Sequence, residues 1–168
     1  RVFTDPLGEF TRFREALLGF YPEDVRRKKI AARCMTIGQA GQYNFARCTE
    51  RREIVAARMA EAHFCSDVIS LVFLLNRRYA PFYKWMHRAV KPLPLLGDTA
   101  HRLLAELAAS LGFAKKARVM EEVCALLAET LRAQGLSDSP SEALVEHGPA
   151  VQRTLHDPEL RRSDVWAE

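Results

Sequence analysis

Apolar residues recur every three or four positions along most of this chain, which is the spacing of an amphipathic α-helix. The longest such run extends from about Glu53 to Tyr79 and predicts one long central helix against which the others pack. No stretch shows the alternation of apolar and polar residues that is typical of a half-buried strand. The pattern therefore predicts an all-α fold, a helical bundle of about six or seven helices, with more than about 60% of the residues in helices.

Start signals for two helices precede the long run. Asp5-Pro6 begins the first, because proline suits the first turn and an acidic side chain favours the positive end of the helix dipole. The apolar side chains of this helix are expected to face a core, and they are Phe10, Phe13, Leu17 and Leu18. Pro22-Glu23-Asp24 repeats the signal for a second helix, which we expect to fade at Gly38 and Gly41.

The second half of the chain continues the helical pattern after an extended connector. Pro81 interrupts the long run, and a short helix is predicted over 82–90. The prolines of the segment 91–97 disfavour helix at the residues before them, so this segment is expected to be extended. Three further helices follow, of which the last ends near Asp157-Pro158.

Size and composition indicate one folded domain. The chain has 168 residues, of which 48% are hydrophobic and 27% charged, a mixture able to bury a core. We expect a single helical domain over 1–168, in which 1–91 form a basic region and 92–168 form accessory helices. Because the chain opens on Arg1 rather than Met, we expect it to be the C-terminal part of a longer protein.

Charge is distributed unevenly along the chain. Residues 1–91 hold 17 basic and 9 acidic side chains, a balance of +8, and residues 92–168 hold 8 and 12, a balance of −4. The N-terminal part is therefore expected to prefer anions such as nucleotide phosphates, nucleic acid or an acidic protein surface. The basic run 26–29, taken alone, is better explained as a solvated helix face.

Cysteine usage and hydropathy indicate a cytoplasmic protein that does not enter a membrane. The cysteines lie far apart without a CxxC pair, so we expect reduced thiols with neither a disulfide nor a bound metal. They are Cys34, Cys48, Cys65 and Cys124. The longest apolar runs, such as 72–75, are far too short to span a bilayer.

No motif for an autonomous catalytic centre is present. The chain lacks the glycine-rich phosphate loops GxxxxGK[ST] and GxGxxG, the zinc motif HExxH and a DxD pair for catalytic magnesium. Arg58 and His63 have the R-x4-H spacing of small helical ribonucleases, but five residues of helix place the two side chains roughly 140° apart. We therefore expect no catalytic residue and no activity from this chain alone.

Two polar segments stand out, one at each end of the predicted long helix. Both combine amides, aromatic rings and cations, the groups that stack on a ring and hold an anion. The candidate substrate-binding residues are Gln42, Tyr43, Asn44 and Arg47 in the first segment and Asn76, Tyr79, Tyr83 and Lys84 in the second. Whether the two segments form one site or two is open, as is a structural interpretation in which the tyrosines are core aromatics and Asn76 caps a helix.

The motifs around these segments resemble a known family. They are Phe3-x-Asp5-x-Leu7-Gly8, Tyr21-Pro22-Glu23-Asp24-Val25-Arg26, Gly41-Gln42-Tyr43-Asn44 and Leu74-Leu75-Asn76-x-x-Tyr79-x-Pro81-x-Tyr83-Lys84-Trp85. Over roughly residues 1–96 the chain is similar to the helical region of the domain-of-unknown-function family 4037. The resemblance implies a position behind an N-terminal nucleotidyltransferase-like domain, absent from this chain, that would supply the metal-binding acids.

The resemblance implies a helical domain that contacts substrate or nucleotide and packs against its own nucleotidyltransferase-like domain. The ligand would be a nucleotide or a small-molecule acceptor, and the full-length protein would use a nucleoside triphosphate and magnesium. Cations of this domain would offset phosphate charge. The candidates are Arg47, Arg77, Arg78 and Lys84.

Two other functions stay open. The first is a structural or protein-interaction bundle without a ligand site, and the second, less favoured, is a nucleic-acid-binding or ribonuclease-like domain. Glu61 and Asp67 lie on the predicted long helix and are candidates for an acceptor-side base, although helix carboxylates more often form surface salt bridges.

Overall fold

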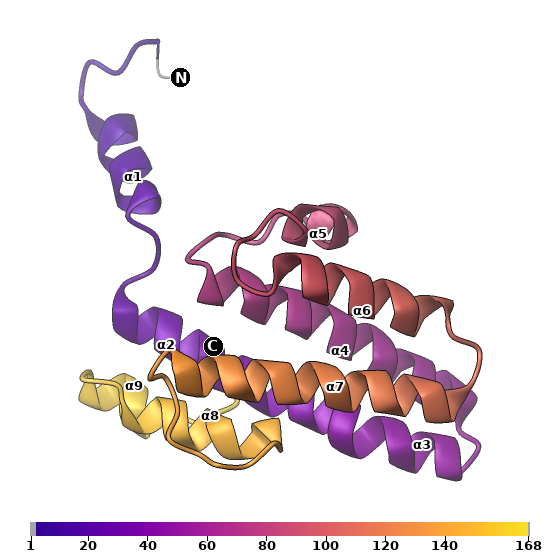
Figure 1. Ribbon diagram of the computed structural model, residues 1–168. Helices are drawn as coiled ribbons and strands as arrows, with labels where there is room; N and C mark the ends of the chain where they lie inside the picture. The colour runs from indigo at the N-terminus through magenta and orange to yellow at the C-terminus, as the bar shows by residue number, and fades with distance from the viewer. Residues whose placement is uncertain (1–2, 168) are drawn as a thin grey trace.

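The computed structural model describes residues 3–167, and these form a helical bundle with 71% of the residues in helices and no strand (Figure 1). In chain order the elements are α1 Glu9–Leu18, α2 Glu23–Ile37, the π-helical segment η1 Gly38–Phe45, α3 Ala46–Glu50, α4 Ile54–Leu75, α5 Tyr83–Val90, α6 Gly97–Ala109, α7 Phe113–Ala133, α8 Leu144–Arg153 and α9 Pro158–Arg162. This architecture confirms the prediction of an all-α bundle.

The longest helix is not the one that the apolar pattern indicated. α2, η1 and α3 follow one another without a break and form one helix of 28 residues. The helix expected over 53–79 is α4, which has 22 residues. It ends at Leu75 because the backbone turns into the left-handed region at Arg77, with φ 52°. The long helix and α4 pack together as a hairpin at the centre of the fold (Figure 1).

Two glycines of η1 allow close helix crossings instead of ending a helix. A Cβ atom on Gly41 would lie 2.4 Å from Cδ2 of Phe64 in α4, and one on Gly38 would lie 2.8 Å from Cγ1 of Val145 in α8. The expectation that the second helix fades at these glycines is therefore wrong. Without a side chain, each glycine lets a neighbouring helix cross η1 at close range.

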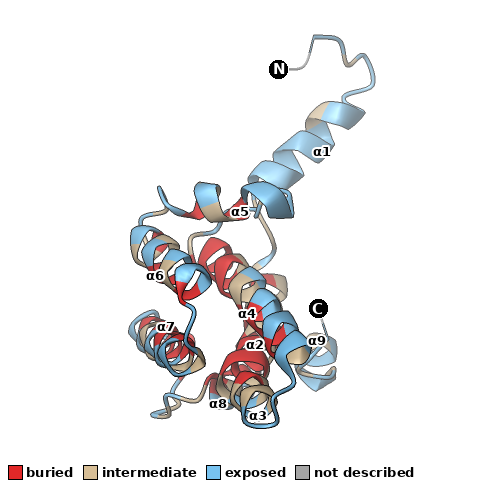
Figure 2. Ribbon diagram, turned by 90° about the vertical axis from the view of Figure 1, so that its right-hand side faces the viewer, coloured by how far each residue is buried: buried red, intermediate tan, exposed pale blue. Residues whose placement is uncertain are grey.

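The other helices surround the hairpin. α8 packs along α2, while α6 and α7 pack together and cover α4 and η1 (Figures 1 and 2). One apolar cluster extends from Ile30 in α2 to Val151 in α8 and contains the fully buried Phe45 and Phe64. The accessory helices of 92–168 therefore contribute to the same core as the basic region.

A buried ion pair crosses this core. Lys116 of α7 is fully buried, and its Nζ donates to Oε1 of Glu61 in α4 and, at 2.6 Å, to the carbonyl of Leu107 in α6. Arg58 Nη1 donates to Oε2 of Glu61 at 2.9 Å. Glu61 therefore faces the core rather than a ligand: its side chain is 10% exposed and forms ion pairs with the buried Lys116 and with Arg58, whose side chain is 48% exposed.

α1 projects from the bundle and buries none of its side chains (Figures 1 and 2). The side chains expected to face a core are exposed: Phe10 by 65%, Phe13 by 61%, Leu17 by 62% and Leu18 by 69%. The helix begins at Glu9 and not at Asp5-Pro6 as expected, although the Asp5 carboxylate accepts the N–H of Thr11 in its first turn at 2.7 Å. The expectation that these side chains are buried is wrong. The local sequence is enough to form an apolar stripe on α1, but burying the stripe requires a second surface, and no other described element packs against it.

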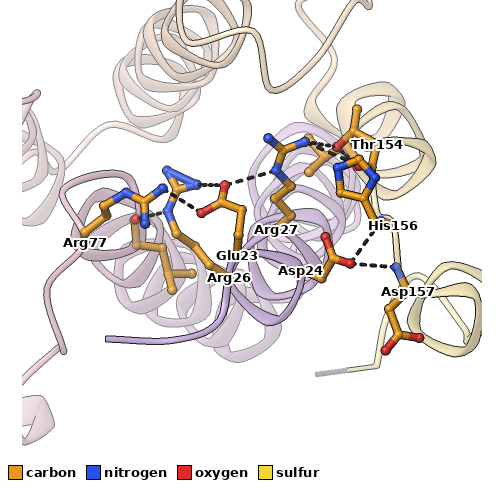
Figure 3. Close-up of polar contacts among 10 residues, drawn as sticks. Glu23, Asp24, Arg26, Arg27, Arg77, Thr154, His156 and Asp157 are labelled. Atoms are coloured by element: carbon orange, nitrogen blue, oxygen red, sulfur yellow. Dashed lines mark hydrogen bonds and ion pairs between the residues drawn. The ribbon is translucent and has the colours of Figure 1, made fainter. Parts of the chain in front are cut away.

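The first turn of α2 anchors this helix to two distant parts of the chain (Figure 3). Glu23 accepts hydrogen bonds from Arg26 at 3.1 Å, from Arg27 at 3.0 Å and from Arg77 at 2.6 Å. Asp24 Oδ2 accepts the backbone N–H groups of His156 at 2.9 Å and Asp157 at 2.6 Å, just before α9. These contacts join the start of α2 to the end of α4 and to the C-terminal segment.

The Asp24 contacts predict a loss of stability in acid. The hydrogen bond from Asp157 N–H holds the pKa of Asp24 below its ordinary value. A lowered folded-state pKa contributes stability that is present above the unfolded value of about 3.9 and is lost as the pH falls through the folded value. We expect the urea midpoint to fall between about pH 5 and pH 3. The urea midpoint should decrease less over this pH range in Asp24→Asn. In the control Glu129→Gln, which changes an exposed residue, it should decrease as much as in the parent protein. An equal decrease in all three proteins would contradict the stabilising role of Asp24.

Candidate functional site

A groove of about 420 Å³ runs along one face of the hairpin and is called here the hairpin groove. One face of the long helix lines it from one side, and one face of α4 lines it from the other. From the long helix come Thr36, Gln39, Ala40, Asn44 and Cys48, from α4 Ala56, Met59, Ala60, His63 and Asp67, and from the C-terminal segment Trp166.

The hairpin groove combines an apolar floor with a few polar groups. Alanines and Met59 supply the floor, while Gln39, Asn44 and His63 supply hydrogen-bonding groups above it. Most of one wall is η1, and π-helical turns are uncommon and frequent at functional sites. An apolar cleft with a small number of placed polar groups is the usual form of a small-molecule site.

The indole of Trp166 is brought to the hairpin groove by a fixed C-terminal segment. Nζ of the buried Lys28 donates to the carbonyl of Asp164, and Nε2 of Gln152 donates to the carbonyl of Ser163 at 2.7 Å. Burial lowers the pKa of Lys28. Trp166 itself is 42% exposed, so its ring offers a surface on which a planar ligand can stack.

Asp67 is the carboxylate of the hairpin groove, and it is paired. Its Oδ1 lies 3.4 Å from Nη1 of Arg33 on α2. Of the two carboxylates considered as a base, Asp67 therefore faces the hairpin groove, whereas Glu61 is buried in the core.

Of the first predicted segment, Asn44 alone faces the hairpin groove. Gln42 lies on another face of η1, where its Oε1 accepts the N–H of Leu144 at 2.9 Å and its Nε2 donates to Oε2 of Glu121 at 2.9 Å. Gln42 therefore links η1 to the start of α8 and to α7, and its amide serves a structural contact. Tyr43 is 50% exposed, and the Arg47 guanidinium lies 4.8 Å from its ring centre.

The second predicted segment lies at the far end of α4. Asn76 caps this helix, since its Nδ2 donates to the carbonyls of Val72 at 2.7 Å and Leu95 at 2.9 Å, and its Oδ1 accepts the Leu95 N–H at 2.9 Å. Tyr83 is 73% exposed, and Lys84 Nζ lies 4.9 Å from the ring centre of Trp85. Tyr79 packs on Tyr21 with ring centres 4.9 Å apart.

The two predicted segments do not come together. Gly41 meets α4 at Phe64, which is twelve residues, or about 18 Å of helix, from Asn76. Gln39, His63 and Trp166 line the hairpin groove although the sequence did not indicate them as binding residues. A signal for His63 existed, because Met59, His63 and Asp67 recur every fourth residue beside the apolar stripe. None existed for Trp166, whose position depends on the tertiary fold.

The contacts of Asn76 predict a structural effect of its substitution. Asn76→Ala would leave the N–H and carbonyl of Leu95 without this partner, so we expect the free energy of unfolding to fall by about 2 kcal/mol. Chemical denaturation measures this change. The exposed Tyr83 serves as the control, and Tyr83→Phe should change stability by less than about 0.5 kcal/mol. An unchanged denaturation midpoint in Asn76→Ala would contradict the capping role.

The R-x4-H pair does not form a common site. Arg58 donates to Glu61 and its guanidinium carbon lies 5.9 Å from the ring centre of Phe113, whereas His63 faces the hairpin groove. The geometry agrees with the expected angular separation on the helix. The ribonuclease interpretation therefore gains no support from this pair.

The cysteines are free thiols, and three of them are shielded. Burial raises the pKa of Cys34 and of Cys65 to about 12 and raises that of Cys124 as well. Cys48 is half-buried and lines the hairpin groove. Within residues 3–167 no three His, Cys, Asp or Glu side chains gather as a metal site, and no helix there has the length and apolarity needed to cross a membrane.

Comparison with known proteins relates this chain to one family. Neither the curated proteins nor the solved structures gave a match. A family model covers residues 1–86, which contain α1, the long helix, α4 and part of α5. Apart from Trp166, both walls of the hairpin groove lie in the matched region. The chain therefore belongs to the family described as Domain of unknown function (DUF4037).

Proposed function

We propose that this chain is the ligand-contacting helical domain of a nucleotidyltransferase-like protein and is not catalytic alone. The observation that carries the proposal is the hairpin groove, a cleft of about 420 Å³ built by η1 and α4 within the family region. Its volume lies within the range of small-molecule sites. The ligand is a nucleotide or a small-molecule acceptor.

The groove lining suits a ring with polar edges. Asn44 and Gln39 offer amide donors and acceptors to such edges, and Trp166 offers a face for stacking. A helical domain of this kind positions a substrate and leaves the chemistry to its partner. Positioning alone supplies a large part of the rate enhancement in phosphoryl and nucleotidyl transfer.

The magnesium and its acids belong to the partner domain. The hairpin groove does not fit a magnesium site, because Asp67 is its one carboxylate among the described residues and is paired with Arg33. The exposure of α1 supports docking on such a domain, since the helix buries no residue and its apolar stripe is exposed. An exposed apolar stripe of this kind favours packing against another protein surface, because the packing removes its side chains from water.

Alkylation of Cys48 tests ligand binding in the hairpin groove. We expect iodoacetamide to modify Cys48 before the three shielded cysteines, as measured by peptide mass spectrometry. A nucleoside or nucleoside triphosphate should slow this modification several-fold, because it covers the thiol. Asn44→Ala should remove the protection, and Tyr43→Phe, on an exposed neighbour, should retain it.

The outcomes separate the candidate functions. Protection by nucleosides that depends on Asn44 supports the proposal. No protection by any nucleoside, nucleotide or small acceptor would contradict it and favour a structural bundle that docks through α1. Protection by single-stranded RNA but not by mononucleotides, with an affinity that falls steeply with salt, would favour the nucleic-acid alternative.

A further inference from the structure

α5 lies at the outer edge of the bundle, where it packs on α4 and α6 and leaves its other side exposed (Figures 1 and 2). Three aromatic rings and three cations of this helix and its two flanking residues are exposed, and together they are called here the α5 surface. They are Phe82, Tyr83, Lys84, Trp85, Arg88 and Lys91. Two of the residues that the sequence indicated as binding residues, Tyr83 and Lys84, therefore belong to this surface.

Contacts on the inner side of α5 fix this surface in place. Met86 and Val90 are four residues apart and are buried in the core. The ring of His87 stacks on that of His101 in α6 with ring centres 4.2 Å apart, and its Nε2 donates to the His101 carbonyl at 3.0 Å. The α5 surface is therefore already formed before any partner binds.

A row of cations follows one face of α5. Lys84, Arg88 and Lys91 are spaced by four and three residues, so they share a helix face and follow one another at about 6 Å and about 4.5 Å along the axis. Within the part of the chain that the structure describes, none of the three forms an ion pair. The sequence from 76 to 97 contains no Asp or Glu. The row therefore keeps its positive charge and favours an anionic partner.

Three exposed aromatic rings lie beside this row. The rings of Phe82, Tyr83 and Trp85 belong to residues that are 48–73% exposed. The ring centre of Phe82 lies 4.6 Å from that of Tyr83 and 6.4 Å from that of Trp85. Lys84 Nζ lies 4.9 Å from the ring centre of Trp85, which joins the rings to the row of cations. Open rings beside unpaired cations are the groups on which single-stranded nucleic acids stack their bases and neutralise their phosphates.

We propose that the α5 surface binds single-stranded nucleic acid, with bases on its rings and the phosphate backbone along its row of cations. A lipid surface fits less well, because insertion requires apolar side chains along one face of a helix. Met86 and Val90, which share such a face, are buried in the core. The three exposed rings belong to the first turn, where successive residues are about 100° apart, so they point around the helix.

The α5 surface is separate from the hairpin groove, and its binding goes beyond the proposed function. It follows the end of α4, whereas η1 crosses α4 at Phe64, about 18 Å of helix before Asn76. The residues of the α5 surface do not line the hairpin groove. Nucleic-acid binding here therefore needs no ligand in the groove.

Fluorescence anisotropy of a labelled oligouridylate of about twelve nucleotides tests the inference on the whole chain. We expect saturable binding whose log affinity falls linearly with log salt. Tyr83→Ala should weaken binding about tenfold, the loss typical of one stacked base, and so should Trp85→Ala. Tyr83 is the more exposed of the two, so its variant keeps the test valid if Trp85→Ala fails to fold.

The cations are tested in a double variant with a matched control. Arg88→Gln with Lys91→Gln should weaken binding and reduce the salt slope by about 1.4, because two phosphate contacts are lost. The control, Arg51→Gln with Arg118→Gln, removes two exposed cations from other parts of the fold and should change neither quantity. Equal weakening in the control would overturn the inference, since the binding would then reflect overall charge.

Other probes separate the possible partners. An abasic strand of the same length should bind about tenfold more weakly or worse, and equal binding of both strands would overturn the role of the rings. Absence of oligouridylate binding would also overturn the inference. If vesicles containing phosphatidylserine, or polyglutamate, bound through these residues instead, the partner would be a lipid surface or an acidic protein.

The two sites have different readouts, so they can fail separately. Nucleoside protection of Cys48 should be unchanged in Tyr83→Ala, because Tyr83 lies outside the hairpin groove. Oligouridylate binding at the α5 surface without nucleoside protection of Cys48 would support this inference and contradict the proposed function. Protection of Cys48 without oligouridylate binding would support the proposed function and overturn the inference.

Discussion

Lys116→Met is expected to lower the free energy of unfolding by about 3–5 kcal/mol, the usual consequence of removing one partner of a buried ion pair. Lys116 is fully buried, and its ammonium group joins Glu61 to the Leu107 carbonyl. Without it the Glu61 carboxylate stays in the core with Arg58 as its remaining partner. Equilibrium denaturation in urea measures the loss.

Its neighbour Lys115 is the matched control. The side chain of Lys115 is 53% exposed and its Nζ lies 3.0 Å from Glu106, so Lys115→Met should cost at most about 1 kcal/mol. The double substitution Glu61→Leu with Lys116→Met should recover most of the loss, because two apolar side chains replace two charges. A double variant less stable than Lys116→Met alone would show that Glu61 contributes in another way.

Gly41→Val is expected to destabilise the chain by about 3 kcal/mol, at the upper end of the cost of overpacking. Its Cβ would lie 2.4 Å from Cδ2 of Phe64, which is fully buried. The clash should also separate η1 from α4 and reduce ligand protection of Cys48 in the hairpin groove. Thermal and urea denaturation with Cys48 alkylation measure both effects.

Gly112→Ala is the control for this substitution. No atom lies within 4 Å of a Cβ placed on Gly112, and its φ of −85° suits any residue, so the substitution should cost no more than about 1 kcal/mol, the usual effect of alanine at an N-cap. Phe64→Leu added to Gly41→Val should restore part of the lost stability, since it makes room for the new side chain. If Gly41→Val were as stable as the parent protein, the close crossing of η1 and α4 would be wrong.

The sequence predicted local features well because they depend on neighbouring residues. Helical periodicity identified the all-α fold and located α4 to within a few residues of its ends. Pro22-Glu23-Asp24 marked the start of α2 as expected, whereas α1 begins at Glu9, four residues after Asp5. Of the amide, aromatic and cationic residues singled out near α4 as candidates for ligand binding, Asn44 lines the hairpin groove, and the binding itself stays a prediction.

The candidate site could be predicted only in part, because the same residue types also serve as structural contacts. Gln42 and Asn76 carry the chemistry expected of a binding site, yet their amides fasten α8 and the segment before α6. Trp166 carried no motif and His63 only the R-x4-H spacing of another function, and both nevertheless line the hairpin groove. Whether a side chain lines a pocket depends on how the neighbouring helices pack around it. The spacing of residues along one helix carries no information about that packing.

The amino-acid sequence by itself therefore determined the helical class, the approximate position of α4 and the excess of positive charge in residues 1–91. Each of these follows from periodicity or composition. The tertiary structure alone decided that Gly41 lies inside a helix, that Glu61 is buried against Lys116 and that the stripe of α1 stays exposed. These outcomes depend on which surfaces meet, and contacts between residues distant in the chain set them.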